Sequence, residues 1–164
     1  MKLLPYDKFQ FIVNAPISEV RERLAAHVEP RSFWNIFAGG GNSDFIGKIE
    51  NDSFKIHRNI SYRNSFLPTI CGSLEPHPLG TKISIRMRLH MLVIAFLIFW
   101  IFQAMKFTLP FSGIIWADIG QLVFLVGAPL LITYLAFWFE AKKARIILEE
   151  LYKNTANTPL ELSR

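Results

Sequence analysis

Two long apolar runs dominate the second half of the chain. Residues 89–105 include no Lys, Arg, Asp or Glu, and residues 119–139 are likewise uncharged. A helix rises about 1.5 Å per residue, so roughly 20 apolar residues cross the ~30 Å hydrocarbon core of a bilayer. The second run meets this length unaided, and the first does so when the Lys106 side chain extends outward to the interface. We therefore predict membrane spans at about 89–108 and 119–139.

The first 88 residues show the two-residue alternation that is typical of half-buried strands. Phe9, Phe11 and Val13 share one side of a predicted strand at 8–13. Near the end of this region one face of another predicted strand is apolar, with Ile83, Ile85, Met87 and Leu89. The opposite face of that strand carries Lys82, Ser84, Arg86 and Arg88. Together with the turn residues between them, such patterns predict four further strands, at about 44–50, 53–62, 66–75 and 81–89.

Two further segments show the spacing of helices. After the first strand, apolar residues recur at Ile17, Val20, Leu24 and Val28. Asn14 is expected to cap this helix, and Pro30 is expected to end it. Beyond the second apolar run, residues 140–153 place Ala144, Ile147, Leu148 and Leu151 on one side. This second segment is predicted to be an amphipathic helix.

These patterns predict an α+β membrane protein. A small antiparallel sheet with one helix is followed by a two-helix transmembrane hairpin and a C-terminal amphipathic helix. The expected divisions are a strand-rich cytoplasmic domain at 1–88, the hairpin at 89–139, and the last helix with a tail at 140–164. The alternative is a helical hairpin buried inside a soluble α+β protein. Two long runs without a polar stripe disfavour that alternative.

The distribution of charge predicts an orientation. The chain carries 18 Lys and Arg against 13 Asp and Glu, a formal net charge of +5. The basic residues at the outer ends of the spans are Arg86, Arg88, Lys142, Lys143 and Arg145, whereas the connection between the spans offers only Lys106. Cytoplasmic flanks carry an excess of Lys and Arg, so both termini are expected in the cytoplasm and the spans in the plasma (inner) membrane. The single cysteine, Cys71, excludes a disulfide scaffold.

One arginine lies in an otherwise apolar row. If the strand at 53–62 is regular, Arg58 shares its face with Phe54, Ile56 and Ile60. A buried guanidinium needs a carboxylate, carbonyls, water or an anionic ligand. Gly47 and Gly72 lie in the matching rows of the neighbouring strands and leave room, so the three residues predict a small ligand-binding cavity with a cationic wall. The alternative, which the sequence favours, is that the glycines mark bulges or tight sheet curvature and that Arg58 reaches the rim through a register change.

Other chemistry is not indicated. The run Gly39-Gly40-Gly41 lacks the Lys and Ser/Thr of a phosphate-binding loop. The histidines and Cys71 do not have metal-ligand spacing, and no catalytic constellation stands out. We predict no catalytic residues, no metal and no cofactor, and the sequence favours a non-enzymatic function. The basic and aromatic cluster at 58–64 is too small to indicate a nucleic-acid partner, and none is expected.

The predicted partners are the lipid bilayer and either another protein or further copies of this chain. Gly120 and Gly127 lie seven residues apart on one helix face, where they allow close helix packing within the hairpin or between copies. The leading hypothesis is a membrane-anchored binding or scaffolding module, as a subunit of a larger membrane assembly. The alternatives are lipid or small-anion binding or processing by the sheet domain, and an oligomeric transport component.

A further indication comes from residues 64–90. The run Asn64-Ser65-Phe66-Leu67-Pro68, then Gly72, the segment 80–85, and Arg88-Leu89-His90 at the first span resemble small bacterial membrane proteins that join a cytosolic strand-rich segment to a helical hairpin. The resemblance covers about 45–105. It implies location and architecture, and it brings no established activity and no catalytic residues.

Overall fold

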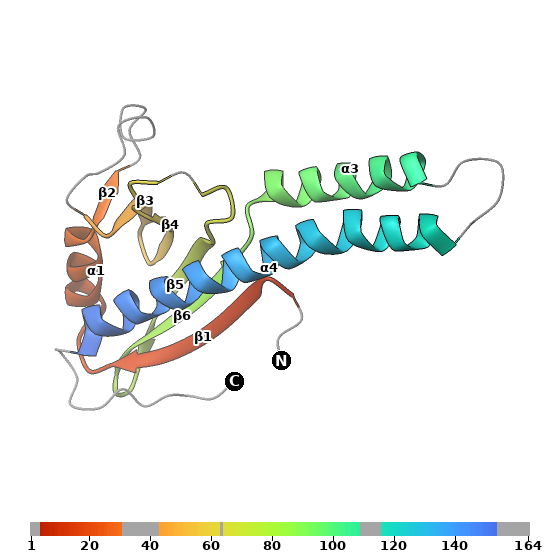
Figure 1. Cartoon of the computed structure of the whole chain (residues 1–164). Coiled ribbons are helices and arrows are strands. Elements are labelled where there is room, and N and C mark those ends of the chain that lie inside the picture. The colour runs from red at the N-terminus through yellow and green to blue at the C-terminus, as the bar shows by residue number, and fades with distance from the viewer. Residues whose placement is uncertain (1–3, 31–42, 63, 109–115, 154–164) are drawn as a thin grey trace.

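The computed structural model describes residues 4–30, 43–62, 64–108 and 116–153 (Figure 1). Within these ranges the chain forms an α+β fold, as predicted. The strands and helices in chain order are β1 (Tyr6–Val13), α1 (Ile17–Ala26), β2 (Val28–Pro30), β3 (Phe45–Glu50), β4 (Ser53–Arg58), β5 (Thr69–His77), β6 (Gly80–Arg88), α3 (Met91–Thr108) and α4 (Trp116–Lys153).

The strands form one six-stranded sheet in the order β1-β6-β5-β4-β3-β2. All neighbouring pairs are antiparallel except β2 and β3, which are parallel. Helix α1 connects β1 at one edge of the sheet to β2 at the other. The sheet is therefore mostly antiparallel.

One face of the sheet is buried under helices. Ile83, Ile85 and Met87 of β6 are fully buried, which confirms the face predicted from their alternation. Val20 and Leu24 of α1 join them in the core. Helix α4 adds a buried row at helical spacing, formed by Phe137, Ala141, Ala144, Leu148 and Tyr152. Burying a large apolar side chain contributes about 1.5–3 kcal/mol, so this row holds α4 on the sheet.

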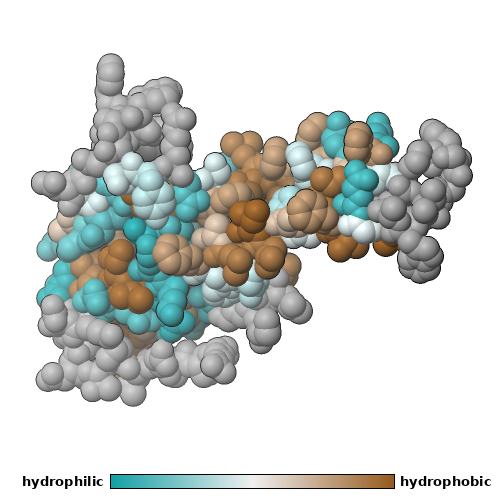
Figure 2. Space-filling model, in the orientation of Figure 1, coloured by the Kyte–Doolittle hydropathy of each residue, from teal (hydrophilic) through white to brown (hydrophobic). Residues whose placement is uncertain are grey.

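Helix α3 and the first half of α4 run side by side in opposite directions and project away from the sheet (Figure 1). The indole N–H of Trp100 donates to the carbonyl oxygen of Leu125 at 2.9 Å, across the two helices. Both helices are long and apolar enough to cross a membrane. Figure 2 shows hydrophobic residues gathered along this projection, whereas hydrophilic residues are frequent over the sheet domain.

Several predicted boundaries are wrong. Helix α1 begins after Pro16 rather than after a cap at Asn14, and the Pro16 side chain has no acceptor that could cap it. The helix ends at Ala26. Val28 fits the helical spacing but lies in β2, where its branched side chain suits an extended backbone. The strand predicted at 53–62 ends at Arg58, and the one predicted at 66–75 is β5.

Helix α4 joins the second apolar run to the helix predicted at 140–153 without a break. It runs from Trp116 to Lys153, so the predicted division between 139 and 140 falls inside one helix. The glycines at 39–41, the connection at 109–115 and the tail at 154–164 lie outside the described residues.

Candidate functional site

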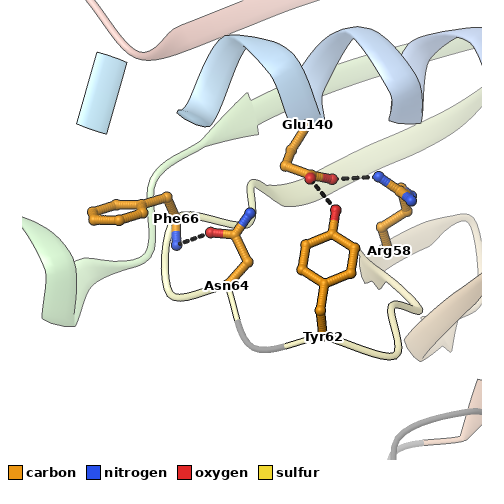
Figure 3. A network of polar contacts seen from close by, with 5 residues as sticks. All are labelled: Arg58, Tyr62, Asn64, Phe66 and Glu140. Carbon is orange, nitrogen blue, oxygen red and sulfur yellow. Dashed lines mark hydrogen bonds and ion pairs between the residues drawn. The ribbon is translucent and has the colours of Figure 1, made fainter. Parts of the chain in front are cut away.

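A polar network joins the sheet to α4 at the place where the projecting helices meet the domain (Figure 3). Phe54, Ile56 and Arg58 lie on the covered face of β4, as their alternation predicted. The Arg58 guanidinium forms an ion pair with the Glu140 carboxylate of α4, through Nη1 and Oε2. The Arg58 side chain is 15% exposed and that of Glu140 is 1% exposed, so the pair is largely shielded from water.

Tyr62 completes the network from the segment that follows β4. Its hydroxyl donates a hydrogen bond to Oε1 of Glu140, while Arg58 donates to Oε2. Because this bond and partial burial favour the neutral phenol, the pKa of Tyr62 is raised above its ordinary value near 10. Both carboxylate oxygens therefore have a donor, and the charge of Arg58 is balanced inside the protein.

A groove of about 650 Å³ opens beside this network. It is lined by Tyr62, Asn64, Leu135, Ala136, Phe139, Glu140 and Lys143. Its apolar wall comes from the end of the uncharged part of α4, and its polar wall comes from the network and from Asn64. The Asn64 side-chain oxygen accepts a hydrogen bond from the Phe66 N–H at 3.0 Å. The Lys143 ammonium lies 4.0 Å from the centre of the Phe139 ring.

The charges of the groove leave one cation uncompensated. Arg58 and Glu140 neutralise each other. Within the described parts of the chain, Lys143 forms no ion pair. The groove therefore combines an apolar wall with a single uncompensated positive charge, which lies just after the uncharged part of α4.

Gly47 and Gly72 share the covered face with Arg58 but do not border open space. Gly72 is paired with Phe54, and a Cβ at Gly72 would lie 2.1 Å from Cζ of the Phe54 ring. Gly47 is paired with Ile56, and a Cβ there would lie 2.2 Å from the carbonyl oxygen of Lys55. The glycines thus let β4 pack closely between its neighbours. The guanidinium of Arg58 is paired with Glu140. Binding of an anion by Arg58 stays a prediction.

Gly120 and Gly127 lie on an open side of α4. A Cβ at either position would have no neighbouring atom within 4 Å. The two glycines therefore do not contact α3 in the described structure, and their packing against another copy stays a prediction.

A second groove, of about 510 Å³, lies between α1 and the end of α4. Its lining residues are Arg23, Ala26, His27, Asp44, Ile147, Glu150 and Leu151. The His27 ring contacts Asp44 through Nδ1 and Oδ2 at 2.8 Å. Both side chains are nearly half exposed, so this pair is a surface contact that joins the end of α1 to the start of β3.

Sequence reasoning identified Arg58 but missed its partner Glu140. The available signal was the position of Glu140 as the first charged residue after 21 uncharged ones, at the end of an apolar run where a carboxylate needs a partner. Among the described residues, no group of three or more His, Cys, Asp or Glu side chains is arranged to hold a metal ion. Comparison of the chain with protein-family models, with curated proteins and with solved structures finds no match.

Proposed function

We propose that the protein is an integral membrane protein whose α+β domain is held against the bilayer as a binding or scaffolding module. In this proposal α3 and the first half of α4 form a transmembrane hairpin, and the second half of α4 is an amphipathic helix that covers the sheet. The exposed apolar surface of both helices supports insertion, since Met91 is 76% exposed and Phe124 is 71% exposed. Exposure of such an apolar surface to water is unfavourable, whereas its exposure to lipid is not.

The orientation in the proposal follows from the basic residues. Arg86 and Arg88 precede α3, and Lys142 and Lys143 follow the uncharged part of α4. An excess of Lys and Arg marks the cytoplasmic side. In this proposal the sheet domain and both termini lie on the cytoplasmic side, and the membrane is a bacterial inner membrane.

The observation that carries the proposal is that the connections between the sheet domain and the two helices are short or continuous. Strand β6 ends at Arg88 and α3 begins at Met91. Helix α4 continues from its apolar half into the sheet core without a break, and Glu140 is tied to Arg58 and Tyr62 at the junction. A domain joined to two helices in this way keeps a fixed height and orientation at the bilayer. That property suits a surface that must be presented to a partner in the membrane or beside it.

The test is extraction of the full chain into lipid nanodiscs with its surrounding bilayer, followed by native mass spectrometry. We expect a complex with another protein or with a second copy. A variant with a Gly-Ser linker inserted between Leu89 and His90 should still enter the membrane but lose part of that complex. A single copy without bound protein, from both chains, would contradict a scaffolding role.

The groove beside Glu140 favours a second candidate function, which is binding of an anionic lipid. Its apolar wall is continuous with the lipid-facing side of α4, and Lys143 supplies a cation for a phosphate. Lys143→Gln should lower the amount of retained anionic lipid, measured by native mass spectrometry. The matched control is Lys142→Gln, which removes the same charge from an exposed neighbour outside the groove. Equal retention of anionic lipid in both variants would show that the groove is not the binding site.

A further inference from the structure

The face of the sheet opposite α1 and α4 carries a row of cations. Strand register aligns Lys8 with Arg86, Arg86 with Cys71, Cys71 with Lys55, and Lys55 with Lys48. Except for Cys71, the members of this line are exposed cations. The line crosses β1, β6, β5, β4 and β3, so at an interstrand spacing of about 4.8 Å it is roughly 19 Å long. We call Lys8, Arg86, Lys55 and Lys48 the cationic row.

Two pairs in the cationic row place like charges directly opposite each other. Lys8 is aligned with Arg86 across β1 and β6, and Lys48 is aligned with Lys55 across β3 and β4. Opposed like charges destabilise an antiparallel pair. Protection of a sheet edge does not account for this arrangement, because Arg86 and Lys55 lie on interior strands. An unfavourable local arrangement of this kind indicates a binding surface.

Carboxylates neutralise only part of this face. Glu50 pairs with Lys48, and Glu75 lies 3.4 Å from the ammonium of Lys82. The remaining carboxylate of the strands on this side, Glu29, lies on the edge strand β2, beyond the row. Within the described ranges, no ion pair involves Lys8, Lys55 or Arg86.

The orientation of α4 determines the direction in which the open face of the sheet points. Helix α4 packs lengthwise on the covered face from Phe137 to Tyr152, so its axis runs parallel to the sheet (Figure 1). Under the proposed function, on which this inference rests, the same helix crosses the bilayer. The sheet then stands upright on the membrane, and its open face looks along the membrane surface. A neighbouring protein at the membrane surface can therefore reach the whole row from the side.

We infer that the cationic row binds an acidic segment of a partner protein. Carboxylates placed along the row would relieve the repulsion between Lys8 and Arg86 and would supply a partner for Lys55, since Lys48 already pairs with Glu50. These contacts favour the bound state over the free protein. An extended segment of about six residues covers the length of the row. The row contains no aromatic side chain on which a base could stack, which disfavours single-stranded nucleic acid.

The test uses the full chain in nanodiscs of phosphatidylcholine. A fluorescent oligoglutamate peptide of about six residues, matched to the length of the row, is titrated and its anisotropy is measured at low and at physiological salt. The variant Lys55→Glu/Arg86→Glu is compared with Arg21→Glu/Lys142→Glu. The second variant changes the net charge equally but lies on α1 and α4, away from the row.

We expect salt-sensitive binding that weakens about tenfold or more in the row variant and less than about threefold in the matched variant. Equal weakening in both variants would overturn the inference, and so would a wild-type chain that does not bind the peptide. Tighter binding of an oligothymidine than of the peptide would assign the row to nucleic acid instead. Loss of peptide binding when phosphatidylglycerol is added would assign it to lipid. Flotation of each variant with vesicles separates these outcomes from failure of the membrane anchor.

Discussion

The two halves of α4 use apolar side chains in different ways. Up to Phe139 the large apolar residues are mostly exposed, and Leu131 is 58% exposed. Beyond Glu140 the apolar residues Ala144 and Leu148 are fully buried against the sheet. Because the helix is continuous, the difference arises from its surroundings rather than from a change in backbone. The second half belongs to the core of the sheet domain, and the first half has an apolar surface that lipid would cover.

The junction between the two halves is a buried ion pair, and its disruption is expected to have the largest effect. Glu140→Ala leaves the Arg58 guanidinium without its carboxylate and removes the acceptor of Tyr62. Loss of one partner of a buried pair costs about 3–5 kcal/mol of unfolding free energy. The measurement is denaturant unfolding of the sheet domain in detergent micelles, followed by amide hydrogen exchange.

A double variant sharpens this prediction. Arg58→Met/Glu140→Met replaces both charges by apolar side chains, and it should recover most of the stability lost in Glu140→Ala. The exposed pair of Lys48 and Glu50 serves as the control, because Glu50→Gln should leave stability nearly unchanged. If Glu140→Ala is as mild as Glu50→Gln, the junction does not hold α4 to the sheet.

Truncation of one leucine in each half of α4 is expected to have the next largest effect on stability. Leu148→Ala removes a fully buried side chain and is expected to cost about 2–5 kcal/mol. Leu131→Ala is expected to cost less than about 0.5 kcal/mol, because lipid or detergent surrounds the side chain in the folded and unfolded states. Thermal unfolding in micelles compares the two variants. Similar costs would mean that residue 131 is buried by protein in the folded state.

Added methyl groups at glycines probe the same contrast with a smaller effect. Gly72→Ala forces the Phe54 ring to move and should cost about 1–3 kcal/mol. Gly127→Ala meets no atom of the chain and should be neutral or stabilise the helix by up to about 1 kcal/mol. If Gly127→Ala instead lowers stability while shifting the protein from oligomer to monomer, the glycine packs between copies. Sedimentation in micelles gives the oligomeric state.

The smallest expected effect is a pH dependence of the Tyr62 hydrogen bond. The pKa of Tyr62 is higher in the folded protein than in the unfolded chain, so the bond contributes its full stability below pH 10. That contribution is lost as the pH rises through the folded value. Tyr62→Phe should therefore lower stability by about 1 kcal/mol at neutral pH, and the difference from wild type should shrink above pH 10. A difference that does not change with pH would contradict the donor role of Tyr62.

The parts of the fold that the sequence predicted are those in which one face of an element is buried. The row Ile83, Ile85 and Met87 alternates because β6 has a covered face, and this alternation is visible in a single sequence. Strand β2 escaped prediction because it has three residues and because Val28 fits the helical spacing that precedes it. A short strand is defined by its pairing with β3, which is a tertiary contact.

The candidate site was only partly predictable for a similar reason. The unusual position of Arg58 in an apolar row could be recognised, but Glu140 lies 82 residues away. Their contact depends on which side of α4 faces β4, and a sequence pattern does not determine that rotation. The cationic row likewise depends on the register of five strands, although the basic face of β6 was recognisable from Arg86 and Arg88.

The most direct test of the account is a nitroxide scan along α4 in liposomes, in a Cys71→Ser background. Labels at Val123, Leu131 and Leu135 should be accessible to oxygen but not to a water-soluble nickel reagent. Labels at Lys142 and Ile146 should be accessible to the nickel reagent, and labels at Ala144 and Leu148 to neither. The helical period of accessibility should continue through Glu140. Nickel access at 123, 131 and 135, or loss of the helical period at 140, would contradict a single helix that passes from the bilayer into the sheet core.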